Sequence, residues 1–112
     1  MDKREDKIKT YIKRFIGKIV KLGKIERVIL FGSRARGDFR KISDVDLIIV
    51  SKDFEKQPFY ARSQQFYLLW DYPDDVEIDI ICLTPKELNI RKRTSGIVHD
   101  AIKEGIEISL SA

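Results

Sequence analysis

The sequence contains one cysteine, one histidine and one tryptophan among its 112 residues. A single cysteine, Cys82, excludes an internal disulfide framework and fits a reducing compartment. A single histidine, His99, excludes a metal cluster built from histidines. No apolar run approaches the roughly 20 residues that a membrane-spanning helix needs, and residues 1–6 are too charged for a signal peptide. These scarcities predict a cytoplasmic protein that has no membrane partner.

The two scarce reactive residues also have unremarkable predicted roles. Cys82 lies in an apolar segment and is predicted to be a small buried residue, because no base that could activate its thiol is indicated. His99 is predicted to lie on a helix surface and not to act as a general base. The basic run 91–93 is expected to be solvated, although it could contact nucleic acid or an acidic partner.

Length and composition favour a single globular domain over residues 1–112. Apolar residues make up 43% of the chain and charged residues 36%, which excludes a disordered protein. The formal net charge is +4 and the pI is about 9.2, so anionic partners such as nucleotides or nucleic acid are favoured, though weakly. Oligomeric state stays open, and the exposed aromatics around residues 59–67 could serve an interface.

Helical and extended patterns alternate along the chain. Isoleucine and phenylalanine residues at helical spacing predict an amphipathic helix over residues 2–22. Strands are predicted at 27–31, 45–50, 76–83 and 106–110, and helices at 58–70, from 85 onward and at 97–104. The first strand is apolar throughout, which predicts a central position, and the last is predicted to lie at an edge. The fold class is therefore α/β, a small mixed β-sheet packed with helices.

Two of the predicted helices carry more specific signals. Pro58 suits a first helical position, and an apolar stripe formed by Phe59, Phe66, Leu69 and Trp70 is predicted to face the core and not to stack bases. Thr84 and Glu87 form a predicted capping box at the start of the next helix. That helix is expected to break between residues 89 and 96.

Two aspartates stand at the head of an apolar strand. Asp44 and Asp46 are spaced by two, so their side chains point to the same side of an extended chain, with Cα atoms about 6.5–7 Å apart. Two carboxylates this close repel each other unless a cation lies between them. The pair therefore predicts a metal site, since two carboxylates this close can share metal ions.

A glycine-serine turn ends the preceding strand. Gly32 and Ser33 follow the apolar run directly, so exposed backbone N–H groups and the Ser33 hydroxyl could bind phosphate. Arg34 and Arg36 could offset the phosphate charge. A tight turn alone would be the default interpretation, but the aspartate pair eleven residues after Ser33 strengthens the prediction of a phosphate site.

Two-metal phosphoryl transfer needs a third carboxylate, and Asp79 is the candidate. It lies on a predicted strand that could neighbour the strand of Asp46, within an apolar context where an unpaired carboxylate would be costly. Asp79 could also accept the proton of an incoming hydroxyl. Glu77 is the alternative on the same face, although a surface role is expected for it.

These residues together resemble the DNA polymerase beta-type nucleotidyltransferase superfamily. The resemblance rests on Gly32-Ser33, the Asp44-x-Asp46 pair and a lone Asp79 on a later strand, within residues 25–88. The segment Gly-Ser-Arg-Ala-Arg-Gly and the short length are most similar to the minimal nucleotidyltransferases of HEPN/MNT toxin–antitoxin pairs. The resemblance implies a polymerase beta palm-like fold.

The resemblance also implies an activity. A nucleoside triphosphate would be held by Gly32 and Ser33, and two Mg²⁺ ions by Asp44, Asp46 and Asp79. A nucleoside monophosphate, with ATP as the expected donor, would be transferred to a hydroxyl and pyrophosphate released. By analogy with minimal members, the partner would be a HEPN-domain toxin that the chain inactivates as an antitoxin by adding AMP. The chain is too short for the helical acceptor-binding domain of larger relatives, so the acceptor is expected to be recognised by a small surface or brought by a partner chain.

Two other functions stay open from the sequence. A catalytically idle module could neutralise a partner by contact alone, and double substitution of Asp44 and Asp46 would then leave neutralisation intact. A nucleic-acid-binding protein is suggested by the positive charge, and its binding would weaken steeply with salt.

Overall fold

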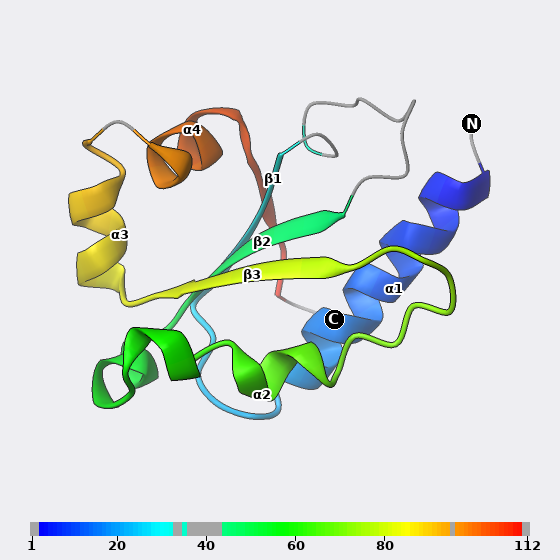
Figure 1. The fold of residues 1–112 in the computed structure, drawn as a ribbon, viewed down its shortest axis with the longest axis horizontal. Helices are drawn as coiled ribbons and strands as arrows, with labels where there is room; N and C mark the ends of the chain where they lie inside the picture. The colour runs from blue at the N-terminus through cyan, green and yellow to red at the C-terminus, as the bar shows by residue number, and fades with distance from the viewer. Residues whose placement is uncertain (1–2, 33–34, 36–43, 95, 111–112) are drawn as a thin grey trace.

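A computed structural model describes residues 3–32, 35, 44–94 and 96–110 of the chain. Its helices and strands follow in the order shown in Figure 1. The elements are α1 (Lys3–Ile19), β1 (Arg27–Phe31), β2 (Val45–Val50), the 3₁₀ turns η1 (Lys52–Lys56) and η2 (Phe59–Ala61), α2 (Gln64–Tyr67), β3 (Ile78–Leu83), α3 (Pro85–Arg91), α4 (Ile97–Glu104) and β4 (Ile106–Ile108). No helix in the described ranges is both long and apolar enough to cross a membrane.

The four strands form one mixed sheet in the order β3-β2-β1-β4. β2 runs antiparallel to β1 and parallel to β3, while β4 pairs antiparallel with β1. The predicted α/β class is confirmed, with β1 central and β4 at an edge. The structure shortens several predicted elements, since α1 ends at Ile19, β3 begins at Ile78 and β4 ends at Ile108.

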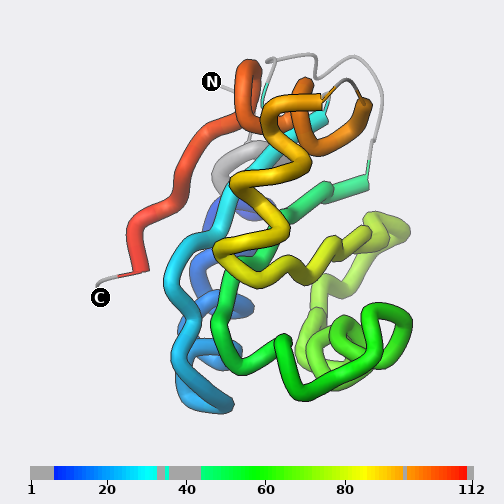
Figure 2. Tube along the Cα trace, turned by 90° about the vertical axis from the view of Figure 1, so that its left-hand side faces the viewer, coloured from blue at the N-terminus to red at the C-terminus, as the bar shows by residue number. Residues whose placement is uncertain are grey.

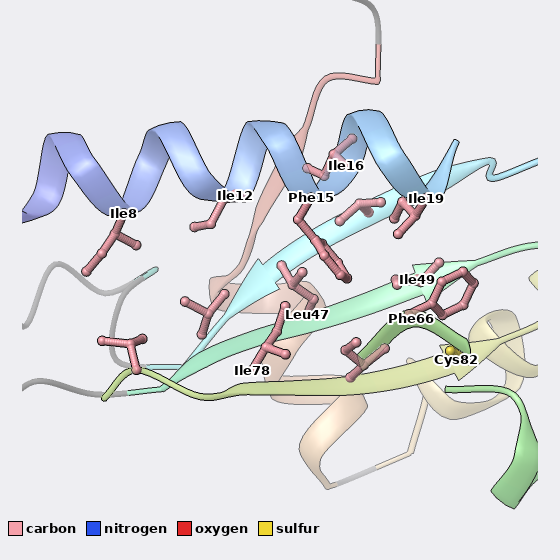
Figure 3. Packing of buried hydrophobic residues seen from close by; sticks show 14 of the residues in the cluster. Ile8, Ile12, Phe15, Ile16, Ile19, Leu47, Ile49, Phe66, Ile78 and Cys82 are labelled. Carbon is pink, nitrogen blue, oxygen red and sulfur yellow. The ribbon is translucent and has the colours of Figure 1, made fainter. Parts of the chain in front are cut away.

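One face of the sheet is covered by α1. The apolar stripe of α1 packs on the sheet residues that share its side, as Figure 3 shows for Ile8, Ile12, Phe15, Ile16 and Ile19 above Leu47, Ile49, Ile78 and Cys82. Phe15 and Ile19 are completely or almost completely buried. Because apolar side chains in α1 recur every three to four residues, the whole stripe reaches this face.

The opposite face is covered by α3 and α4. Its buried cluster joins Ile48, Val50 and Leu83 of the sheet to Leu88 of α3 and Val98 of α4. The structure therefore has three layers, with helices on both sides of the sheet (Figures 1 and 2). These two helices pack against the half of the face that holds the carboxyl ends of β2 and β3, because Val50 and Leu83 are the last residues of those strands.

The predicted break after residue 89 is confirmed, because α3 ends at Arg91 and α4 begins at Ile97. The predicted capping box at the start of α3 is also confirmed. The Thr84 hydroxyl accepts from the Glu87 N–H (3.2 Å), and the Glu87 carboxylate accepts from the Thr84 N–H (2.8 Å).

The predicted continuous helix over 58–70 is wrong. This segment forms the short η2 turn and the four-residue α2 instead, and Phe59 of the expected core stripe is 48% exposed. Phe66 is buried as predicted, with Leu69 and Trp70 packed against the core. The interruption turns the Arg62 side chain inward, where it donates to backbone oxygens of Gln57 and Cys82, which an exposed helix position would not allow. The preceding residues 52–56 form the η1 turn.

Candidate active site

Two of the three predicted aspartates face the same side of the sheet on neighbouring strands. Asp46 on β2 is the register partner of Asp79 on β3. Neighbouring strands lie about 4.8 Å apart, and paired residues point to the same face. Side chains two residues apart on a strand point to the same face, so Asp46 shares the face of Ile48, and Asp79 shares that of Ile81. Helices α3 and α4 cover this face further along the strands. The sheet therefore brings these two carboxylates together at the amino ends of the two strands.

Asp44 lies just before this pair. The Val45 N–H donates to the Glu77 carbonyl at 2.9 Å, so the ladder between the two strands continues back to the residue after Asp44. Asp44 is half-buried, as is Asp46, whereas Asp79 is exposed. An unpaired carboxylate at Asp79 was expected to be costly. This expectation is wrong, because the Asp79 side chain is in contact with water and is not enclosed by its apolar neighbours.

Gly32 lies against the carboxylate of Asp46. Phe31, the last residue of β1, is the register partner of Asp46, so Gly32 follows directly beside it. The Gly32 φ is +78°, and a Cβ built there would meet the Asp46 Oδ2 atom. Only glycine combines this backbone conformation with so close an approach. The remaining predicted phosphate-binding residues, Ser33, Arg34 and Arg36, lie outside the described residues.

We predict that Gly32→Ala lowers both stability and any transfer activity. The positive φ costs an alanine about 1–2 kcal/mol in free energy of unfolding, and its Cβ would displace the Asp46 carboxylate. Gly17→Ala is the matched control, because Gly17 lies in α1 with open space around it, and alanine there should stabilise by about 0.5–1 kcal/mol. Urea unfolding of both variants measures this. Equal stability of Gly32→Ala and wild type would contradict the assigned contact.

The chemical type of the three aspartates suits a divalent cation, but their placement among the described residues does not form a metal site. Oxygen ligands from Asp44, Asp46 and Asp79 match what Mg²⁺ requires. Among the residues that the structure describes, however, no group of three His, Cys, Asp or Glu side chains is close enough to hold a metal ion. Metal binding by this set of three therefore stays a prediction.

The two scarce residues take the places that the sequence predicts. Cys82 is 3% exposed, and burial raises the pKa of its thiol to about 12, so it stays protonated and unreactive at neutral pH. His99 lies on α4, half-buried, with its Nδ1 atom 2.9 Å from the Lys92 carbonyl oxygen. Neither residue belongs to the candidate site.

A feature that the sequence did not predict is a hollow of about 410 Å³ next to Asp79. It is lined by Tyr67, Trp70, Val76, Glu77, Ile78 and Asp79. Tyr67 is 40% exposed, which agrees with the expectation of exposed aromatics around residues 59–67. A usable signal was present, since the chain from 71 to 79 carries five carboxylates beside these aromatics.

Comparison with known proteins bears on this arrangement. The family model of the nucleotidyltransferase domain matches residues 12–106, most of the chain. A crystal structure described as that of "a putative nucleotidyltransferase from Sulfolobus solfataricus" has the same fold, with a TM-score of 0.63 over 88% of this chain and 76% of that one, at 23% sequence identity.

Two curated relatives come from Methanocaldococcus jannaschii. "Putative protein adenylyltransferase MJ0141" is 43% identical over 63 residues, which cover 53% of this chain and 63% of the relative. "Putative protein adenylyltransferase MJ0604" is 53% identical over 34 residues, which cover 30% of this chain and 34% of the relative. The matched regions thus span less than two thirds of each relative. With the domain match over residues 12–106, the chain belongs to the nucleotidyltransferase domain family.

Proposed function

We propose that the protein transfers a nucleoside monophosphate, AMP from ATP, to a hydroxyl group on another protein and releases pyrophosphate. The observation that carries this proposal is the in-register placement of Asp46 and Asp79 on one face, with Gly32 against Asp46. The absence of a side chain at Gly32 lets the Asp46 carboxylate lie against the turn whose backbone N–H groups are proposed to bind phosphate. The relatives named as protein adenylyltransferases support the choice of AMP and of a protein acceptor.

Asp44, Asp46 and Asp79 would hold two Mg²⁺ ions in this function. When bound, the ions lower the pKa of the attacking hydroxyl and offset the charge of the leaving pyrophosphate. The carboxylates would fix the positions of these ions, and the half-buried position of Asp46 limits the water that competes for its oxygens. Ser33, Arg34 and Arg36 are proposed to bind the phosphates alongside Gly32.

The reaction is a displacement at the α-phosphorus of ATP. The acceptor oxygen forms a bond to that phosphorus, the bond to the bridging oxygen of the β-phosphate breaks, and pyrophosphate leaves with that oxygen. The proton of the acceptor hydroxyl goes to the carboxylate of Asp79, which is exposed and therefore open to an incoming substrate. No reductant, oxidant or further reactant is needed.

The acceptor in the cell is proposed to be a HEPN-domain toxin, which places the protein as a cytoplasmic antitoxin. The experiment uses ATP labelled at the α- or the γ-phosphate, with Mg²⁺ and the product of the adjacent gene. We expect acid-precipitable label from the α-labelled ATP only, lost in excess EDTA. Label from γ-labelled ATP would indicate a kinase, and no label from either would refute the proposed transfer.

A second candidate function is neutralisation of a partner by contact alone. It is favoured by one observation, since the described residues contain no three-carboxylate metal group. The double variant Asp44→Ala with Asp46→Ala separates the two functions. Continued protection of cells from the partner by this variant would favour contact, whereas loss of protection with unchanged binding to the partner would favour transfer.

A further inference from the structure

The hollow next to Asp79 has walls that are fixed in place. At the outer edge of β3, which faces away from β2, the Tyr67 hydroxyl oxygen accepts a hydrogen bond from the Ile80 N–H at 3.1 Å. The Trp70 Nε1–H donates to the Val76 carbonyl at 2.8 Å, and its ring stacks on Tyr72 with centroids 5.8 Å apart. Figures 1 and 2 both show α2 alongside β3. A pre-ordered wall lowers the entropy cost of binding.

The same edge of β3 offers unused backbone groups. Because Glu77 and Leu83 direct their carbonyls toward the β2 side, the alternation of a parallel ladder directs the N–H and C=O of Ile78 outward. Apart from the hydrogen bonds between β2 and β3, the described part of the chain contains no hydrogen bond to the N–H or the C=O of Ile78. A peptide backbone can form hydrogen bonds with Ile78 at this point of the edge, whereas the Val76 carbonyl and the Ile80 N–H on either side are already bonded to Trp70 and Tyr67.

The charge at the hollow is negative, although the whole chain carries +4. Glu77 and Asp79 are exposed, and no lysine or arginine of the described ranges pairs with either. The nearby Asp71 and Asp74 differ, since Arg14 and Lys18 of α1 pair with the first and Lys7 with the second. A ligand with positive charge is therefore favoured, and the phosphates of a nucleic acid are repelled.

The order of these features across the sheet assigns a role to the hollow. Gly32 at the end of β1, Asp46 on β2, Asp79 on β3 and then the hollow follow one another from strand to strand. Phosphates bound at Gly32 occupy the β1 side, so the side open to a second substrate is that of β3. An acceptor seated in the hollow would bring its hydroxyl to Asp79.

We propose that this hollow binds an extended segment of the protein substrate in which lysine or arginine residues flank the acceptor hydroxyl. The aromatic rings of Tyr67 and Trp70 would contact the acceptor residue and its basic neighbours, while Glu77 would pair with a flanking cation. The transfer itself rests on the proposed function, but binding of the segment does not.

The test uses Trp70, the only tryptophan in the sequence, as a reporter inside the hollow. The probe is a short peptide with one tyrosine between arginines, titrated without nucleotide or metal while tryptophan emission is excited selectively. The control peptide carries glutamate in place of each arginine. We expect the arginine peptide to shift Trp70 emission saturably, and the glutamate peptide to bind at least about tenfold more weakly.

Charge-reversed variants locate the binding. Glu77→Lys should weaken the arginine peptide about tenfold, whereas Glu55→Lys, the same change at an exposed position on η1, should leave its affinity within about twofold. Tyr67→Ala should also weaken it, and thermal unfolding of each variant reports whether the fold is kept. Equal weakening by the two lysine variants, equal binding of both peptides, or preferential binding of single-stranded RNA would each overturn the proposal.

Transfer assays with the same peptides separate this proposal from the function it rests on. Peptide binding at Trp70 without any label transfer from ATP would refute the transferase function and leave the docking site standing. Transfer to arginine and glutamate peptides at equal rates would refute the docking site and leave the function standing. A shift of Trp70 emission by ATP alone, lost in Glu77→Lys, would show that the hollow holds the nucleotide and would overturn the proposal.

Discussion

Asp46→Asn is expected to lower the rate of nucleotidyl transfer by at least about 10²–10³-fold while the protein stays folded, the size of loss found when one preorganised electrostatic group is removed from an active site. The change keeps the shape of the side chain and removes its charge. Asp46 lies between Gly32 and Asp79, so it is the described carboxylate best placed to bear on both the phosphates and the acceptor. The rate of label transfer from α-labelled ATP measures the effect.

Asp53→Asn is the control for this change. Asp53 is an exposed aspartate on η1, beyond the carboxyl end of β2, whereas Asp46 lies near its amino end. Transfer by this variant should equal that of wild type. Equal rates in both variants would move the active site away from Asp46. Titration with Mn²⁺, followed by electron paramagnetic resonance, gives a readout besides activity, because Asp46→Asn should weaken ion binding and Asp53→Asn should not.

The parts of this site differ in how far the sequence predicts them. The spacing of Asp44 and Asp46 and the glycine after an apolar run are local patterns, and the structure confirms that Gly32 adjoins the Asp46 carboxylate. Asp79 faces the same side as Asp46 because β2 and β3 pair in a parallel register. This register joins residues that are 33 positions apart in the sequence. No local pattern contains that register. The sequence indicated only that the strand of Asp79 could neighbour that of Asp46, and the structure gives the register directly.

The segment after β2 shows where sequence patterns mislead. Its aromatic residues recur at helical spacing, so a single helix with a core-facing stripe was predicted, but tertiary contacts outweigh that preference. Arg62 falls within that predicted helix, and in the structure it is 6% exposed. Its burial depends on partners 20 and 25 residues away, the Cys82 carbonyl and the Glu87 carboxylate. Neither partner is visible in a local window of sequence.

Arg62→Ala is expected to destabilise the protein by about 3 kcal/mol, at the lower end of the range for breaking a buried pair because Glu87 is partly exposed. The Arg62 guanidinium donates to the Glu87 carboxylate at 2.6 Å, to the Cys82 carbonyl at 3.3 Å and to the Gln57 carbonyl at 3.1 Å. It thereby links the segment before α2, the edge strand β3 and the capping box of α3. Removal leaves the Gln57 and Cys82 carbonyls without this donor, and the Glu87 carboxylate keeps the hydrogen bond from the Thr84 N–H.

Arg14→Ala is the matched control, since Arg14 on α1 also pairs with a carboxylate, that of Asp71, but both side chains are largely exposed. An exposed pair contributes about 0–1 kcal/mol, so this variant should unfold at nearly the wild-type urea concentration. Similar destabilisation by the two substitutions would show that burial of Arg62 does not set its contribution. Arg62→Lys should rescue only part of the loss, because one ammonium cannot reproduce the fork of guanidinium donors.

The stability difference between wild type and Arg62→Ala should depend on pH if the Glu87 contact is its source. Burial alone raises the pKa of Glu87, but hydrogen bonds from Arg62 and from the Thr84 N–H outweigh it, so the pKa lies below its ordinary 4.5. A carboxyl with a lowered folded pKa stabilises the protein above the ordinary value, and this contribution is lost as pH falls through the folded pKa. The gap between wild type and Arg62→Ala should therefore be constant above about pH 5.5 and narrow below pH 4.5. A gap that stays the same down to the acid transition would assign the effect to the two carbonyl contacts, which do not titrate.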